Sequence, residues 1–272
     1  MINKKIILRN SLLIVGFLLS SFLMNAQEAG DVDLKKWKVV VPVDSGDGVS
    51  TELLGKQIKK VNDNEKVKKY FRQNSNYTYE LKGKFTGVNE NGRFSLNQGE
   101  FSSTEFVEVG SKKDKGYWSN SGNHQVKTRL KCYKVEGQGS TYVARIRSLD
   151  KDGKEYDKVR VMWRDGYVLA EVHETYYGGT RYKRTRIGEV GENMFNITLR
   201  VTNGNVYISI HCKRTDLTKK NISLAQYSNT KTSKNLFRVG NFYKNDQSAE
   251  DSLSVQLKYI TLTHSDKYVS KK

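Results

Sequence analysis

Residues 159–173 read VRVMWRDGYVLAEVH, and this stretch carries the clearest fold signal in the chain. Apolar, β-branched and aromatic residues dominate 159–163 and 167–173, which is typical of β-strands. Asp165-Gly166 stands between the two runs, and an Asp-Gly pair supplies the left-handed backbone that a tight hairpin turn needs. The stretch therefore predicts two antiparallel strands joined by a two-residue turn.

The same pattern continues on both sides of this hairpin. Asn203-Gly204 and Asn91-Gly92 are further tight-turn signals between strand-like runs. The other expected strands share period-two alternation: 77–85, 93–96, 127–135, 195–201, 206–211 and 252–263. Many short strands separated by Gly and Asn turns predict an all-β sandwich or jelly roll.

Only the stretch 51–71 breaks this pattern clearly. It is rich in lysine and lacks alternation, and a short helix is expected around 64–70. The chain has 272 residues and a single proline, Pro42, and it contains no Ser/Pro-rich linker or repeat. All-β domains of this size commonly remain single, so one domain is expected over 27–272.

The N-terminal segment predicts export. Lys4, Lys5 and Arg9 form a basic start, an apolar run covers 12–23, and Ala26 provides a small residue for cleavage. A membrane anchor is the competing interpretation, but the run is shorter than the roughly 20 residues that a membrane span needs. We therefore expect residues 1–26 to be a signal peptide, no membrane span, and a secreted or periplasmic protein.

The charge of the chain narrows the class of partner. The formal net charge is +18, which predicts attraction to polyanions. Nucleic acid is not expected as a partner, because an exported chain seldom meets it. An acidic extracellular polysaccharide fits both the charge and the location, although a basic surface with no specific partner explains the charge as well.

Two cysteines, Cys132 and Cys212, leave two alternatives open. They could pair in an oxidising compartment, or remain as two buried thiols, since each extends an apolar alternation. No CxxC pair or histidine cluster accompanies them, so zinc is not expected. We expect neither a metal nor another cofactor.

Several landmarks along the chain resemble one family. LKKWKVVVPVD at 34–44 resembles the Trp-Lys-Leu-x-Leu-Pro opening of the alginate lyases in polysaccharide lyase family 7. STEFVE at 103–108 lies where that family carries Arg-Ser/Thr-Glu-Leu-Arg-Glu, and LFRVGNF at 236–242 is similar to its Tyr-Phe-Lys-Ala-Gly-Asn-Tyr. The order and spacing of the landmarks hold over 34–245. The resemblance implies a β-jelly roll with a concave substrate groove.

The resemblance also implies a chemistry, which the residues of this chain alter. Family members cleave uronate polymers by β-elimination, with an Arg, a Gln, a His and a Tyr at the site. The corresponding positions here are Ser103, Arg145, Arg147 and Phe242. A guanidinium effectively never loses its proton near neutral pH, so it cannot serve as the base. Phe242 has no hydroxyl.

If the chain is still an enzyme, a different residue must act as base or acid. Tyr243 is the candidate catalytic residue, although neighbouring strand residues face opposite sides of a sheet and only a bulge would turn it into the groove. His173 and His124 are other candidate bases, each also explained as an ordinary strand or loop histidine. Whether the chain is an enzyme is therefore left open.

Period-two counting gives a set of candidate substrate-binding residues. If Phe242 faces the groove, so do Arg238 and Lys244, while Arg145 and Arg147 share one face of their own strand. Arginine can pair with a carboxylate through two parallel hydrogen bonds. The expected substrate-binding residues are Ser103, Glu105, Arg145, Arg147, Arg238, Phe242 and Lys244. The competing interpretation is a β-face whose charges are merely solvated.

Three functions remain as hypotheses. The first is an exported, alginate-lyase-like protein that engages an anionic polysaccharide, uronate or sulfated, in a basic groove and is catalytically impaired or diverged. The second is an active polysaccharide lyase that cleaves alginate or a related polyuronate by β-elimination. The third is a structural surface protein with no specific ligand. A monomer is expected in each case.

Overall fold

The computed structural model describes residues 32–44, 50–76, 78–84, 101–109, 117–136, 140–176, 179–228, 232–244 and 252–265. The expected signal peptide and the Asn91-Gly92 turn lie outside these ranges. The strands are β1 (Trp37–Asp44), β2 (Ser50–Leu54), β3 (Phe71–Gln73), β4 (Tyr79–Lys84), β5 (Phe101–Glu108), β6 (Asn123–Glu136), β7 (Ser140–Leu149), β8 (Glu155–Arg164), β9 (Tyr167–Tyr176), β10 (Gly179–Glu189), β11 (Phe195–Thr202), β12 (Asn205–Cys212), β13 (Leu217–Gln226), β14 (Lys234–Lys244) and β15 (Ser252–Ser265). The helices are α2 (Lys56–Lys59), the 3-10 turn η2 (Val61–Asp63) and α3 (Glu65–Lys68).

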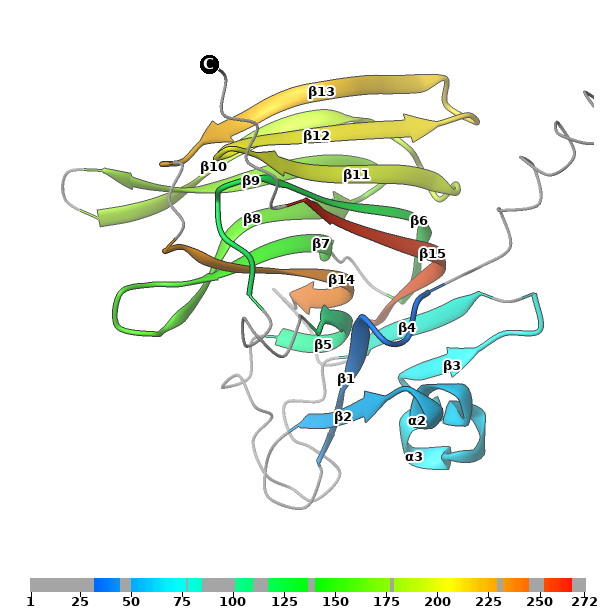
Figure 1. Cartoon of the computed structure of the whole chain (residues 1–272). Helices are drawn as coiled ribbons and strands as arrows, with labels where there is room; N and C mark the ends of the chain where they lie inside the picture. Colours follow the sequence, from blue (N-terminus) through cyan, green and yellow to red (C-terminus); the bar gives the residue numbers. More distant parts are fainter. Residues whose placement is uncertain are drawn as a thin grey trace, which may run out of the picture.

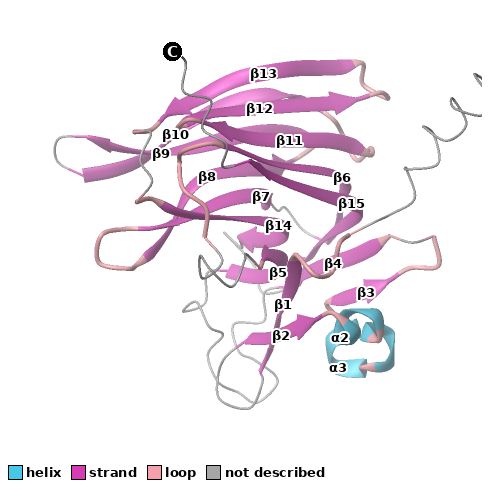
Figure 2. Ribbon diagram, in the orientation of Figure 1, coloured by secondary structure: helices cyan, strands magenta, loops and turns pink. Residues whose placement is uncertain are grey.

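The strands form two antiparallel sheets that lie one over the other (Figure 1). Within the described residues, one sheet has eight strands in the order β10-β9-β8-β7-β14-β5-β1-β2, and the other has seven in the order β13-β12-β11-β6-β15-β4-β3. The short helices gather at one end, beside β2 and β3 (Figure 2). The expectation of an all-β jelly-roll sandwich is therefore confirmed.

Both expected hairpins form with the expected turns. Arg164 pairs with Tyr167, and Asp165 and Gly166 between them have φ angles of 50° and 84°. Asn203 and Gly204 repeat this geometry between β11 and β12, with φ angles of 47° and 83°. These left-handed pairs match the right-handed twist of the strands they join.

Alternating side chains of both sheets fill the space between them. Along β11 buried and half-buried residues alternate at every position, as expected for a strand with one face in the core. The largest fully buried apolar side chains of the sandwich include Trp37, Trp163, Phe106 and Phe237.

Cys132 and Cys212 are both buried and both free, which decides between the two alternatives in favour of buried thiols. Burial raises the pKa of the Cys132 thiol well above its ordinary value. A thiol in such surroundings behaves as a small apolar side chain.

The lysine-rich stretch forms the short helices. Asn64 precedes α3, and its side-chain oxygen accepts hydrogen bonds from the backbone N–H groups of Lys66 and Val67 at 3.2 Å each. This is the usual way to satisfy the first N–H groups of a helix. The helix expected around 64–70 is confirmed in place. Among the described residues, no helix is long and apolar enough to cross a membrane.

Gly240 lets β14 approach β5 closely. Its φ is +155°, and a Cβ added there would lie 2.6 Å from the carbonyl oxygen of Thr104 and 2.8 Å from Cα of Glu105. Gly240→Ala is therefore expected to lower the free energy of unfolding by about 2 kcal/mol, because the backbone of β5 has to move. Denaturant unfolding of the purified chain measures this loss.

Gly188→Ala is the matched control for this change. A Cβ at Gly188 would meet side-chain atoms of Leu217, which can rotate away, and no backbone atom is among its nearest contacts. We expect a smaller loss at Gly188 than at Gly240. Equal losses at the two positions would show that the close approach of β14 to β5 is not the cause.

Candidate functional site

The candidate site lies on the outer face of the eight-stranded sheet, where β5, β14, β7 and β8 are neighbours. Phe106, Ile146 and Phe237 of these strands point into the core, so the residues on either side of each point outward. The register places Arg238 opposite Arg145 and Gly240 opposite Glu105. Three of the predicted residues from different strands are therefore brought together.

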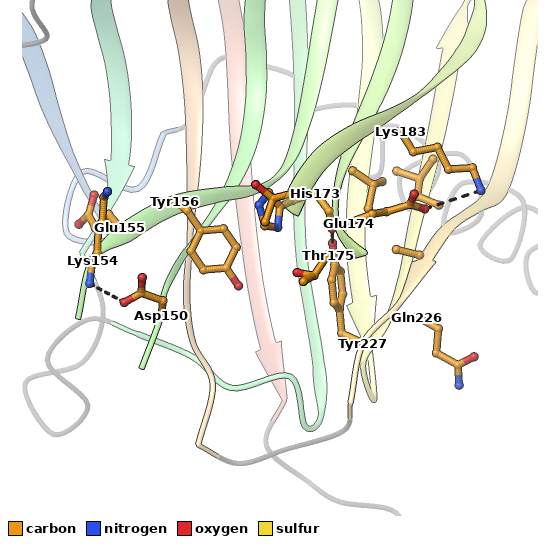
Figure 3. Close-up of a pocket in the computed structure, with 14 residues that line it drawn as sticks. Asp150, Lys154, Glu155, Tyr156, His173, Glu174, Thr175, Lys183, Gln226 and Tyr227 are labelled. Atoms are coloured by element: carbon orange, nitrogen blue, oxygen red, sulfur yellow. Dashed lines mark hydrogen bonds and ion pairs between the residues drawn. The ribbon is translucent and has the colours of Figure 1, made fainter. Parts of the chain in front are cut away.

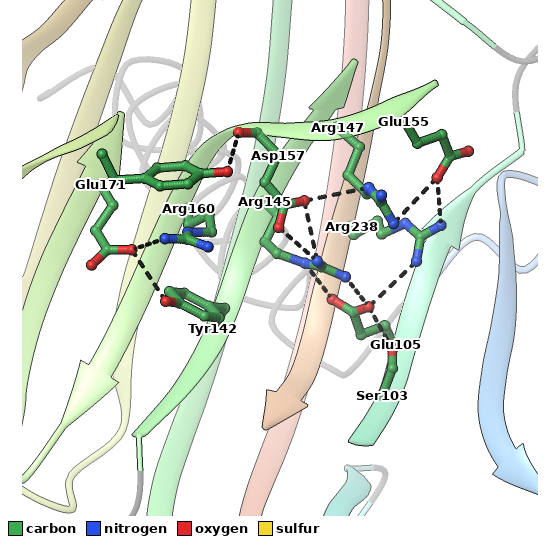
Figure 4. A network of polar contacts seen from close by, with 11 residues as sticks. Ser103, Glu105, Tyr142, Arg145, Arg147, Glu155, Asp157, Arg160, Glu171 and Arg238 are labelled. Atoms are coloured by element: carbon green, nitrogen blue, oxygen red, sulfur yellow. Dashed lines mark hydrogen bonds and ion pairs between the residues drawn. The ribbon is translucent and has the colours of Figure 1, made fainter. Parts of the chain in front are cut away.

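Arg145 is the centre of this arrangement, and it is buried, with 1% of its surface exposed. Its Nε donates to Glu105 Oε1 at 3.0 Å, and its Nη2 donates to the other oxygen of the same carboxylate. Its Nη1 donates to both oxygens of Asp157, at 3.1 and 3.0 Å (Figure 4). The carboxylates of the protein itself therefore take up most of the Arg145 donors.

Burial alone would lower the pKa of Arg145, but the charges of Glu105 and Asp157 raise it above its ordinary value. The two carboxylates also hydrogen-bond to the guanidinium, which favours its charged form further. Arg145 is thus a permanent cation, and it cannot accept a proton from a substrate.

Phe242 covers the face of this guanidinium. The ring centroid of Phe242 lies 3.6 Å from Cζ of Arg145, a distance that allows a cation–π interaction. The ring of Tyr142 follows, with its centroid 6.0 Å from that of Phe242. Ser103 pairs with Phe242 on the neighbouring strand, and its Oγ donates to Glu105 Oε2 at 2.6 Å. Phe242 and Ser103, both expected at the site, therefore contact this central cluster.

Arg147 and Arg238 lie nearer the surface, with 21% and 16% of their side chains exposed. Arg147 Nη1 is 3.2 Å from Glu155 Oε2, and its Nε is 3.3 Å from Asp157 Oδ1. Arg238 reaches Glu105 and Glu155 at 3.6 Å each. We refer to Arg145, Arg147, Arg238, Glu105, Glu155 and Asp157 as the arginine–carboxylate network (Figure 4).

The network holds as many carboxylates as guanidiniums. Its arginines converge on one face as expected, but their charge is offset by Glu105, which was expected there, and by Asp157 and Glu155, which were not. Arg147 and Arg238 are the members with donors near solvent, so they are the ones best placed to meet an anionic ligand.

A second cluster lies beside the network, on β8, β9 and β10. Glu171 accepts hydrogen bonds from Arg160 at 2.6 Å and from Nε of Arg184 at 2.9 Å. Burial would raise the pKa of Glu171, but these two arginines outweigh it and hold the pKa below its ordinary value. Arg160 is stacked between the rings of Tyr142 and Tyr182, 4.5 and 3.5 Å from their centroids.

Of the candidate catalytic residues, neither Tyr243 nor His124 has a described side chain in the network. The backbone of Tyr243 and Lys244 belongs to β14, but their side chains lie outside the described residues. His124 is buried beneath Trp118, where its Nδ1 is 2.9 Å from His264 Nδ1 and its Nε2 is 2.6 Å from the carbonyl oxygen of Ser121. Its neighbours give His124 a place in the sandwich interior and not in the network.

His173 is the histidine that borders a hollow. Its ring lies 5.0 Å from that of Tyr156 and 5.5 Å from that of Tyr182. Burial, and then the charge of Arg160, lower the pKa of His173. The hollow has a volume of about 1030 Å³, and Glu155, Tyr156, His173, Lys183 and Tyr227 are among the residues that line it (Figure 3). Glu155 therefore belongs both to the network and to the wall of the hollow.

No group of His, Cys, Asp and Glu suited to a metal ion occurs among the residues that the structure describes. The site residues that sequence analysis missed are Tyr117, Tyr142, Glu155, Asp157, Arg160 and Glu171. Alternation along 159–173 could have placed Arg160 and Glu171 outward, whereas Asp157 lies beyond an irregularity in the register of β7 and β8.

Comparison with known proteins gives a consistent picture. The family model described as alginate lyase matches residues 32–264. A search of curated protein sequences found no match. Alginate lyase A1-II′, described as a member of polysaccharide lyase family 7, is similar in structure, with a TM-score of 0.66 and 20% identity over 86% of this chain and 96% of its own.

Two further alginate lyases are similar as well. The enzyme from Klebsiella pneumoniae has a TM-score of 0.64 and 14% identity over 87% of this chain and 98% of its own. The enzyme from Pseudomonas aeruginosa has a TM-score of 0.62 and 15% identity over 86% and 100%. At these identities the likeness in structure concerns the fold.

Proposed function

Because this chain belongs to the alginate lyase family, polysaccharide lyase family 7, we propose that it is an exported protein that binds an anionic polysaccharide, uronate or sulfated, on the outer face of its eight-stranded sheet. We further propose that its capacity for β-elimination is impaired. The similar solved structures are alginate lyases, which makes alginate the first polymer to test.

The observation that supports impairment is the state of Arg145. β-Elimination needs a base to remove the proton beside the carboxylate and an acid to protonate the leaving oxygen. Arg145 can be neither, since Glu105 and Asp157 hold it as a cation. Phe242 presents a ring with no hydroxyl to the same spot. Neither residue 145 nor residue 242 can therefore supply the base or the acid that the elimination needs.

Binding is supported by the outer members of the network. Arg147 and Arg238 are partly exposed, and guanidiniums form short, charge-assisted hydrogen bonds with carboxylates and sulfates. The full chain has a net charge of +18, and removal of Lys4, Lys5 and Arg9 with residues 1–26 leaves +15, which favours the approach of a polyanion over longer distances. Both contributions predict binding that weakens as salt concentration rises.

An active lyase with relocated chemistry is the second candidate, and His173 is the observation that favours it. Its lowered pKa leaves the imidazole neutral at pH 7, which a general base requires, and Tyr156 and Tyr182 lie beside it. Tyr243 remains a candidate by sequence.

One experiment separates the two candidates. The mature chain is incubated with alginate, glucuronan and sulfated polymers, while ultraviolet absorbance reports the unsaturated product of elimination. In parallel, retention on the same immobilised polymers is measured at rising salt. We expect no increase in absorbance and retention that salt abolishes.

An increase in absorbance would contradict impairment, and its loss in His173→Gln or Tyr243→Phe would identify the relocated residue. Absence of retention at low salt on every polymer would contradict the binding proposal. Export is tested by expressing the full chain: a mature protein that begins at Gln27 is expected, and retention of residues 1–26 would contradict it.

A further inference from the structure

The arginine–carboxylate network is unevenly satisfied. Arg145 donates to two carboxylates at hydrogen-bonding distance, whereas the terminal nitrogens of Arg238 lie 3.6 Å from theirs, beyond ordinary hydrogen-bond range. Nε of Arg238 is buried and has no hydrogen-bond partner among the described residues. A buried, charged donor without a partner is unfavourable. Arg238 is therefore a guanidinium that a further acceptor would satisfy.

The carboxylates differ in the same way. Glu105 is fully buried and Asp157 is 10% exposed, and both hydrogen-bond to Arg145. Glu155 is 37% exposed, and it contacts Arg147 at 3.2 Å and Arg238 at 3.6 Å. It is the first residue of β8 and follows the turn that begins at Asp150. Glu155 is thus the network carboxylate that can leave without exposing the centre of the network.

Tyr117 lies on the same face as Arg147, Arg238 and Glu155. Trp118 bridges Asn235 in antiparallel fashion, which places Tyr117 opposite Leu236, and Leu236 is opposite Arg147 in β7. Trp118 packs against Phe237 in the core, with ring centroids 4.7 Å apart, so its neighbour Tyr117 is directed to the outer face.

The charges that act on the Tyr117 hydroxyl agree with this placement. Burial raises the pKa of Tyr117, Glu155 raises it further, and Arg238 and Arg147 oppose them. The phenol is therefore protonated at neutral pH and can donate a hydrogen bond. No partner for this hydroxyl occurs within the part of the chain that the structure describes.

We propose that Arg147, Arg238 and Tyr117 form a subsite for one uronate carboxylate of the polysaccharide, and that Glu155 occupies this subsite while no ligand is bound. This inference rests on the proposed function and deepens it. The ligand carboxylate displaces Glu155 toward the adjoining hollow and accepts hydrogen bonds from the two guanidiniums and the phenol. Glu155 therefore acts as an internal competitor of the ligand.

The energetic argument has two parts. Release of Glu155 breaks a partly exposed ion pair, and such pairs are weak because water and salt screen them. A ligand carboxylate gains charge-assisted bonds to Arg238, whose terminal nitrogens lie 3.6 Å from Glu105 and Glu155. Removing the charge of Glu155 should therefore strengthen binding, while removing the Tyr117 hydroxyl should weaken it.

The test is a titration of the mature chain with an alginate oligosaccharide of defined length at low salt, by calorimetry. Glu155→Gln is expected to bind about fivefold more tightly than the unaltered chain, since an exposed ion pair contributes up to about that factor. Tyr117→Phe is expected to bind several-fold more weakly. Thermal unfolding of each variant shows that the fold is kept.

Glu52→Gln is the matched control. Glu52 is also an exposed carboxylate on the eight-stranded sheet, where it lies on the edge strand β2 and pairs with Lys38 of β1 at 2.6 Å. Glu52→Gln removes the same charge as Glu155→Gln. Any gain in affinity that the two variants share therefore reflects the overall electrostatic field of the protein. We expect at most a small gain for Glu52→Gln.

The outcomes separate this inference from the proposed function. If the unaltered chain binds and Glu155→Gln binds no more tightly than Glu52→Gln, Glu155 is not a competitor and the inference is wrong, while the proposed function stands. If Tyr117→Phe binds as well as the unaltered chain, the phenol has no place in the subsite. If neither the unaltered chain nor Glu155→Gln binds, both proposals fall.

Discussion

Replacing Arg145 with leucine is expected to lower the free energy of unfolding by about 3–5 kcal/mol, because it removes the buried guanidinium to which both Glu105 and Asp157 hydrogen-bond. Glu105 is fully buried and Asp157 nearly so, and water cannot solvate their charges in the folded state. Denaturant unfolding followed by circular dichroism gives the loss, provided that the transition remains two-state.

Arg164→Leu provides the control for Arg145→Leu. Arg164 lies on β8 of the same sheet, but it is 55% exposed and reaches Asp165 only at 3.7 Å. We expect the free energy of unfolding to change by less than about 1 kcal/mol in Arg164→Leu, as for other exposed ion pairs. A loss of the same small size in Arg145→Leu would mean that Glu105 and Asp157 do not depend on Arg145.

A combined variant sharpens this test. If Glu105→Gln and Asp157→Asn accompany Arg145→Leu, no buried charge is left unpaired, and much of the stability should return. Recovery would show that the loss in Arg145→Leu arises from unpaired charge and not from poorer packing against Phe242.

The hairpins were predictable because their turns set the register locally. Asp165-Gly166 and Asn203-Gly204 fix which residues pair, and alternation then decides which side chains enter the core. The order of strands within each sheet is different. β14 lies between β5 and β7, far from both in sequence, and no local pattern contains that information. For that part the resemblance to a known family was needed.

The residues of the candidate site also fall into two groups: those that local alternation placed correctly, and those that it did not. Alternation placed Arg145 and Arg238 on one face correctly, because the two residues pair directly between β7 and β14. Phe242 reaches the same face although the register shifts between Val239 and Phe242. Asp157 was missed because the register shifts beside Lys158: Val159 pairs with Ile146, but Arg147 pairs with Asp157. Counting back from Val159 by twos would therefore have placed Asp157 in the core.

The charge of the arginine–carboxylate network differs from the basic surface that the sequence predicted. Sequence analysis placed Glu105 and the arginines at the site but did not predict that they pair, because Glu105 and Arg145 are forty residues apart and meet only through the arrangement of the strands. The expected basic character of these residues is consequently offset by Glu105, Glu155 and Asp157. A specific ligand must then compete with an internal carboxylate, which makes Glu155 central to any account of binding.

The substitutions at the site also depend on one another. Arg145 is tolerable in the interior only because two carboxylates and an aromatic ring surround it. Phe242 packs on Arg145 at a position where the family carries a tyrosine. Arg145, Glu105, Asp157 and Phe242 are therefore best treated as one set in which each residue stabilises the others.

A buried lysine provides the second large effect, this time on pH dependence. Lys158 is 4% exposed, and its Nζ donates to Asn120 Oδ1 at 2.7 Å and to Asn235 Oδ1 at 3.0 Å. It lies 4.5 Å from the ring centroid of Tyr227. Among the described residues no carboxylate pairs with it. Burial lowers the pKa of Lys158 from 10.5 to about 8.

This shift determines how stability varies with pH. In the unfolded chain the lysine keeps its proton up to about pH 10.5, whereas in the folded chain it releases it near pH 8. Between these values the unfolded state binds more protons, so the free energy of unfolding rises with pH. Below pH 8 both states carry the proton, and the contribution is constant and unfavourable.

Lys158→Met removes this titration and should change the pH profile accordingly. Relative to the variant, the free energy of unfolding of the unaltered chain is expected to rise by about 2.5 kcal/mol between pH 7 and pH 10, since each unit of pKa shift corresponds to about 1.4 kcal/mol. The side-chain amides of Asn120 and Asn235 need no new partner in this variant, because Asn235 Nδ2 still donates to Asn120 Oδ1 and Ser148 still donates to Asn235 Oδ1.

Unfolding curves of the two proteins at pH 7, 8, 9 and 10 measure the difference in the free energy of unfolding, in which every other titrating group cancels. Parallel profiles would mean that the two amide oxygens stabilise the ammonium as well as water does, and that the pKa of Lys158 is not lowered by its burial.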